Sequence, residues 1–102
     1  NRYEALFSVS YETDIERVPT VIEAAVGSLP FVLRTPNGPE CELRAFGGDS
    51  VDFGVEYWVN GLDDGKNKYA SEVLFAIWRA LKEAGISMPA LQKAADTGSA
   101  TS

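Results

Sequence analysis

Residues 40–59, ECELRAFGGDSVDFGVEYWV, contain two alternating patterns that are separated by a turn. In residues 40–46 apolar side chains alternate with charged ones, and in residues 51–59 every odd position is apolar. A period of two predicts strands with one buried face. The connection begins with Gly47 and Gly48 and predicts a tight hairpin. Because this connection joins two strands, it lacks the helix N-terminus with which a glycine-rich phosphate loop binds its ligand.

The first part of the chain predicts a strand followed by a helix. Residues 3–11 alternate in the same way as the hairpin strands. Either Thr13 with Glu16 forms a capping box, or Asp14 caps the helix alone. Pro19 leaves two alternatives, an irregular first turn or a helix that begins near this residue. The apolar stripe of this helix is Ile15, Val18, Ile22, Val26 and Leu29.

The remainder predicts loops, a second helix and a short last strand. Prolines and glycines mark residues 31–39 and 61–67 as loops. Gly85 is expected to end the second helix as a left-handed cap. Residues 86–89 then predict a short strand that ends at proline. The buried stripe expected on the second helix is Val73, Leu74, Ile77, Trp78, Leu81 and Ala84.

This order of elements predicts an α+β fold of the ferredoxin-like β-α-β-β-α-β type, an antiparallel sheet of four strands with both helices on one face. A chain of 102 residues has room for one such domain. We expect the domain at residues 1–93 and a disordered tail at residues 94–102, where the sequence is small and polar. The helices should cover the side of the sheet that carries Phe7, Leu43 and Val55.

The opposite side of the sheet is expected to carry Leu6, Phe46 and Trp58 among charged residues. Large apolar side chains on an uncovered face favour a partner surface. The alternative is that Trp58 lies flat on the aliphatic parts of its neighbours.

Composition argues against several classes of function. The chain has 15 acidic and 9 basic residues, a net charge of −6, and this charge disfavours nucleic acid and anionic lipid as partners. It also disfavours an RNA-binding module that stacks bases on sheet aromatics, since such modules surround these aromatics with basic residues. No apolar run is long enough for a membrane span, and the start does not predict a signal peptide.

Few residues offer catalytic or metal-binding chemistry. The chain has no histidine, which removes the commonest general base and metal ligand. Cys41, the single cysteine, lies in an alternating apolar pattern that favours a buried structural role. Asp63 and Asp64 lie in a glycine-containing loop whose spacing does not match a calcium-binding loop, so a solvated turn is expected. We therefore predict no catalytic residue, no metal and no cofactor, and the protein is not expected to be an enzyme.

Three segments resemble one known family. Residues 9–18 resemble the strand-to-helix segment of the small-conductance mechanosensitive channel (MscS) family, residues 46–59 its central hairpin, and residues 81–89 its last helix end with the short strand that follows. The resemblance implies the C-terminal cytoplasmic α/β domain of a homo-heptameric channel, with transmembrane helices and a β domain upstream. Seven such modules would enclose a vestibule with side portals.

The same resemblance implies a function and a location. The channel would release solutes and ions under membrane tension, for osmotic protection, on the cytoplasmic side of the bacterial inner membrane. Contact with the membrane would come through the upstream helices. The candidate subunit or domain interface is Leu6, Phe46, Trp58, Met88 and Pro89, and the expected structural turns and caps are Asp14, Gly47, Gly48 and Gly85. The alternative is a ferredoxin-like domain that binds a small regulatory ligand.

Overall fold

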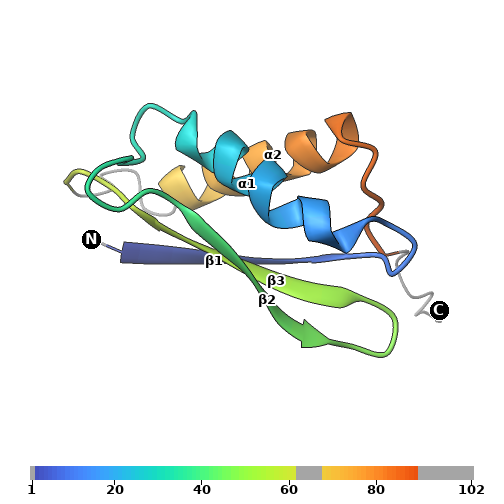
Figure 1. The fold of residues 1–102 in the computed structure, drawn as a ribbon. Helices are drawn as coiled ribbons and strands as arrows, with labels where there is room; N and C mark the ends of the chain where they lie inside the picture. Colours follow the sequence, from blue (N-terminus) through green and yellow to red (C-terminus); the bar gives the residue numbers. More distant parts are fainter. Residues whose placement is uncertain (1, 62–67, 90–102) are drawn as a thin grey trace, which may run out of the picture.

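The computed structural model describes residues 2–61 and 68–89. Both helices lie on one face of the sheet, as predicted (Figure 1). The predicted tail at residues 94–102 lies outside the described residues, as do Asp63 and Asp64. The elements in chain order are β1 (Arg2–Val9), the 3-10 helix η1 (Ile15–Arg17), α1 (Val18–Gly27), β2 (Glu40–Phe46), β3 (Val51–Trp58) and α2 (Lys68–Glu83).

The sheet has the order β1-β3-β2, and both neighbouring pairs are antiparallel. The long alternating segment therefore forms the central strand, β3. Phe53 lies opposite Phe7 on one side and Leu43 on the other, and Val55 lies opposite Cys41. Directly opposed residues project to the same face of a sheet, so the face predicted to meet the helices is confirmed.

The predicted fourth strand is not formed, because residues 86–89 lack strand structure. The segment does run past the end of β1, where the Ser10 N–H donates a hydrogen bond to the Ser87 carbonyl at 2.8 Å. Ile86 is buried and anchors the segment to the core. Pro89 has no N–H to donate to a strand ladder. Within the described residues the sheet has three strands.

Asp14, and not Thr13, caps the first helical turn before α1. Its carboxylate accepts a hydrogen bond from the Glu16 N–H at 3.3 Å. Thr13 instead donates its hydroxyl hydrogen to the Ser10 carbonyl at 2.9 Å. One 3-10 turn follows the cap, and α1 then begins at Val18 with Pro19 in its first turn. A proline costs little there because the first N–H groups of a helix have no partner within it.

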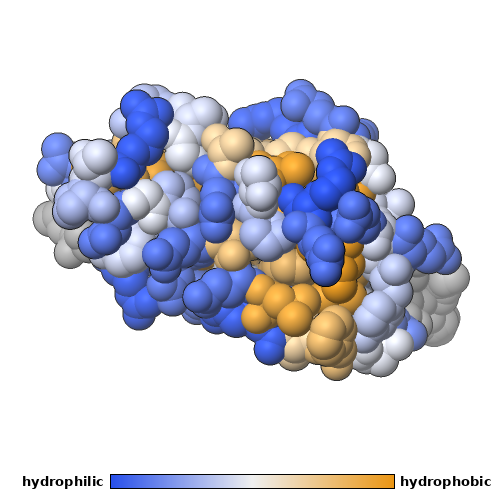
Figure 2. All heavy atoms as spheres, in the orientation of Figure 1, coloured by the Kyte–Doolittle hydropathy of each residue, from blue (hydrophilic) through white to orange (hydrophobic). Residues whose placement is uncertain are grey.

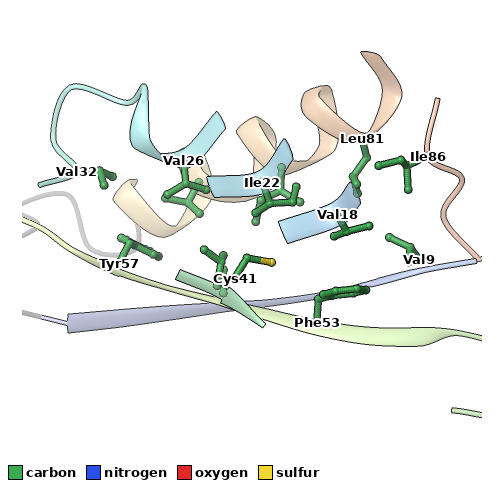
Figure 3. Packing of buried hydrophobic residues seen from close by; sticks show 14 of the residues in the cluster. Val9, Val18, Ile22, Val26, Val32, Cys41, Phe53, Tyr57, Leu81 and Ile86 are labelled. Atoms are coloured by element: carbon green, nitrogen blue, oxygen red, sulfur yellow. The ribbon is translucent and has the colours of Figure 1, made fainter. Parts of the chain in front are cut away.

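The core lies between the sheet and the two helices (Figure 3). Cys41 points into this layer and is buried. Burial and the nearby Glu23 carboxylate raise the pKa of its thiol to about 12. Glu23, on α1, also accepts a hydrogen bond from the Cys41 N–H at 2.9 Å, so it satisfies one donor of the edge strand β2. The prediction of a buried, structural cysteine is confirmed.

Two predicted glycine positions have clear geometric reasons. Gly85 has φ of +71°, and the N–H groups of Gly85 and Ile86 donate to the carbonyls of Lys82 and Leu81 at 3.1 and 2.9 Å. This is the hydrogen-bond pattern of a glycine C-cap. At the hairpin, the Gly47 N–H donates to the Ser50 carbonyl at 2.7 Å, and a Cβ on Gly47 would lie 3.0 Å from that oxygen.

Candidate functional site

The face of the sheet that the helices leave open carries Leu6 and Trp58, as expected. Leu6 is 64% exposed and lies opposite Gly54, which has no side chain to cover it. Trp58 is half-buried and lies opposite Arg2 at the other end of β1. The two apolar side chains are therefore separated along the sheet and do not form one patch.

Phe46 does not lie on this face, so that prediction was wrong. The pairing of β2 with β3 shifts between Leu43 and Ala45, where Arg44 is the extra residue of a bulge. Beyond the bulge Ala45 lies opposite Asp52 and Phe46 lies opposite Val51. Because a one-residue shift exchanges the two faces of a strand, Phe46 projects to the helix side and Ala45 to the open side.

Phe46 nevertheless remains 66% exposed, because the hairpin extends beyond the helices (Figure 1). The Tyr11 ring stacks on it with the centroids 6.4 Å apart. The Tyr11 hydroxyl also donates a hydrogen bond to the Gly47 carbonyl at 2.5 Å. Leu43, predicted to be covered, is on the helix side but is also exposed. We call Tyr11, Leu43 and Phe46 the hairpin patch; apolar surface over the hairpin is visible below α1 in Figure 2.

Charged side chains dominate the open face. The Arg44 guanidinium lies over Gly54 and contacts three carboxylates, those of Glu4 at 2.5 Å, Glu56 at 3.7 Å and Glu42 at 3.8 Å. Its hydrogen bond to Glu4 is the largest cause of a raised pKa for Arg44. Arg2 makes a second contact with Glu56, at 2.7 Å. Glycine at position 54 is what allows this arrangement, since a Cβ there would lie 2.7 Å from the Arg44 guanidinium carbon.

This network gives the open face a net negative charge. Two guanidinium groups, those of Arg2 and Arg44, face the three carboxylates of Glu4, Glu42 and Glu56. An acidic face repels a phosphate backbone, which argues against base stacking on Trp58 as its use.

The second helix carries an exposed apolar surface, part of which the sequence pattern predicted to be buried. Leu74 and Trp78 were predicted to be buried, but Leu74 is 49% exposed and Trp78 is exposed as well. The buried residues of α2 are Val73, Ala76, Ile77 and Leu81. Leu74 and Trp78 lie one position beyond Val73 and Ile77, about 100° round the helix, which turns them out of the core.

Phe75 extends this surface, although the sequence pattern did not predict it as part of an interface. Leu74, Phe75 and Trp78, which we call the α2 patch, line a hollow of 360 Å³ together with Ser71. The Lys82 ammonium lies 4.6 Å from the centroid of the Trp78 ring, a cation–π contact. The signal was present in the sequence, since Ser71, Leu74, Phe75 and Trp78 have helical spacing and form a second stripe beside the buried one.

The other two candidate interface residues lie elsewhere. Met88 is exposed and Pro89 is half-buried, and both follow Ser87, which bonds to Ser10 beyond the C-terminal end of β1. Trp58 lies opposite Arg2, which is at the N-terminal end of β1. The structure therefore does not bring Met88 and Pro89 together with Trp58.

Within residues 2–61 and 68–89, no group of three or more Cys, Asp or Glu side chains is arranged to hold a metal ion. In that same part of the chain, neither helix has the length and apolar character needed to cross a bilayer. The prominent features of the described surface are thus an acidic sheet face, the hairpin patch and the α2 patch. They define an α+β module whose exposed features suit contact with other protein surfaces.

The family model for the C-terminal part of the mechanosensitive ion channel MscS matches residues 4–88, so this chain belongs to that family. The crystal structure of Helicobacter pylori MscS in its closed state is similar over 90% of this chain, with a TM-score of 0.76 and 26% identity. The cryo-EM structure of Arabidopsis thaliana MSL1 A320V covers 90% of the chain, with a TM-score of 0.73 and 15% identity. No curated protein matches the sequence.

The chain spans only about a third of these relatives, 36% of the Helicobacter pylori protein and 35% of MSL1 A320V. The family and the α+β fold predicted from the sequence are confirmed.

Proposed function

We propose that this chain is the cytoplasmic C-terminal module of a channel subunit that opens under membrane tension and releases ions and solutes. The observation that carries the proposal is the family match over residues 4–88, supported by a fold shared with Helicobacter pylori MscS at 26% identity. The rest of the subunit would supply the membrane-spanning helices, on the cytoplasmic side of a bacterial inner membrane. The cell would gain protection against osmotic downshock.

The role proposed for the module is structural. It would pack with copies of itself, seven in a full channel, and enclose a vestibule in front of the pore. Its folded core is built from apolar side chains, and no buried residue of the described part is polar or charged. The net charge of −6 would favour cations over anions within such a vestibule. Catalysis forms no part of the proposed role.

We also propose that the open sheet face, through Leu6 and Trp58, packs on a neighbouring domain of the channel. Leu6 is the reason for this proposal, because it is a large apolar side chain that is 64% exposed and lines a shallow hollow together with Arg44. Trp58 serves as the reporter. In a full-length oligomer in which Trp58 is the sole remaining tryptophan, acrylamide should quench Trp58 less than in the 102-residue chain that carries Trp78→Phe. Equal quenching in the two would exclude this contact.

The channel function can be tested with the full-length subunit in giant liposomes under suction. Single-channel openings that appear above a threshold tension are expected, and a core substitution in this module, such as Leu81→Ala, should reduce the number of active channels. Thr20→Ala is the control, because that side chain is exposed on α1 and belongs to neither the α2 patch nor the hairpin patch. Correctly inserted protein that never opens under tension would refute the proposal.

A further inference from the structure

The α2 patch and the hairpin patch are left without a role by the proposed function. Each consists of three neighbouring large side chains, Leu74, Phe75 and Trp78 in one and Tyr11, Leu43 and Phe46 in the other. Single exposed apolar residues are ordinary on a protein surface, whereas contiguous groups mark contact sites. The α2 patch lies on one helix, whereas the hairpin patch joins two residues of β2 to Tyr11 in the segment after β1.

Both patches have a defined shape without a partner. The Lys82 ammonium lies 4.6 Å from the Trp78 ring, and the α2 patch lines a 360 Å³ hollow. At the hairpin, Phe46 is stacked on Tyr11, whose hydroxyl is bonded to Gly47. Side chains that are already ordered lose less conformational entropy when they bind.

The charges next to the two patches are opposite in sign. At the α2 patch the charged group is the Lys82 ammonium, which lies against the Trp78 ring. Beside the hairpin patch Glu12 and Asp49 are exposed. Arg44, the one basic residue of β2, lies over Gly54 on the open face and is paired with Glu4. The Lys82 ammonium of one copy would be attracted to the Glu12 and Asp49 carboxylates of the next, whereas two α2 patches facing each other would bring two Lys82 ammonium groups together.

From these observations we infer that the α2 patch of one copy of this chain packs on the hairpin patch of the next copy. The inference rests on the proposed homo-oligomer and deepens it by naming the surfaces. A contact between two different surfaces repeats from copy to copy in one direction, and it closes into a ring when the rotation allows. A ring built from such contacts can contain an odd number of subunits as well as an even one.

The size of the patches sets how strong the contact is. Three side chains on each side cover only part of the roughly 800 Å² per partner that a stable interface buries. The 102-residue chain should therefore associate weakly by itself. In the full-length subunit the other domains would hold the modules close together and raise their effective concentration.

Disulfide trapping tests the contact directly. Cys41→Ala removes the native thiol, and Phe75→Cys and Phe46→Cys then place one thiol in each patch. Two differently tagged 102-residue chains, one with each substitution, are mixed and oxidised with copper phenanthroline. The mixture should give at least several-fold more heterodimer than either variant gives homodimer, because only the mixed pair brings Cα atoms within disulfide range.

The matched control is Thr20→Cys, which is also exposed but lies on α1. A heterodimer yield no higher than with this control, or a predominance of Phe75→Cys homodimer, would overturn the inference. Lys82→Glu should lower the heterodimer yield, and Glu12→Lys in the partner chain should restore it.

The same pair in the full-length subunit separates this inference from the proposed function. A subunit carrying both new cysteines should give a ladder of cross-linked multimers in the membrane. Tension-activated openings without any ladder would overturn the contact and leave the channel proposal intact. A ladder without tension-activated openings would support the contact and refute the channel proposal.

Discussion

Leu81→Ala and Leu74→Ala compare the two apolar faces of α2 with the same substitution. Leu81 is 0% exposed and Leu74 is 49% exposed. Both changes replace leucine by alanine within one helix, so their effects on helix propensity are similar and cancel in the comparison. The difference between the two variants therefore reports on burial.

The expected losses follow from the surroundings of each side chain. Leu81 extends from α2 into the core beside Ile86 (Figure 3). Its removal leaves a cavity, so the free energy of unfolding should fall by about 3 kcal/mol. Leu74 keeps about half of its surface in water and solvent fills the space it leaves, so its loss should cost roughly 1 kcal/mol. The two variants should differ by about 2 kcal/mol.

Urea unfolding followed by far-UV circular dichroism measures this difference. With an m-value of about 1 kcal/mol per M for a domain of this size, the two midpoints should lie about 2 M apart. If Leu81→Ala has no folded baseline, the milder pair Leu81→Val and Leu74→Val gives the same comparison. Equal losses, or a larger loss at Leu74, would refute the assignment of the inner and outer faces of α2.

Three other changes have defined outcomes. Gly85→Ala should lower the free energy of unfolding by about 1 kcal/mol, because alanine is strained at positive φ, whereas Gly48→Ala, in open space, should change it little in the same denaturation assay. Because the pKa of the Cys41 thiol is about 12, alkylation of the folded chain at pH 8 should be negligible. Above pH 9 the thiol ionises in the unfolded chain but not in the folded one, so the free energy of unfolding should fall more steeply with pH than it does in Cys41→Ala. Arg44→Gln should destabilise the chain at low salt through repulsion among the carboxylates around Glu4, and added salt should reduce the difference in melting temperature.

Local features of the fold were predictable because they depend on neighbouring residues. The Asp14 cap, the glycine hairpin and the Gly85 cap each follow from the geometry of a few consecutive residues. The last predicted strand failed because strand formation requires a partner over several residues, and residues 86–89 make their contact with Ser10 at the end of β1.

Errors in the candidate site have two physical origins. A bulge at Arg44 changes which side of the sheet Phe46 occupies, and nothing within β2 alone reveals where the pairing shifts. On α2 two apolar stripes lie side by side, and periodicity does not say which of them meets the sheet. That choice depends on how α2 is rotated against α1 and β1.

The amino-acid sequence by itself determined the class of fold, the family, the net charge and the positions of the turns, because alternation, capping and glycine geometry act over a few residues. The tertiary structure decided which apolar side chains remain in water, namely the outer stripe of α2 and the aromatic pair at the hairpin. Exposure is set by the pairing register of two strands and by the rotation of a helix against a sheet, and both are fixed only when distant segments pack together.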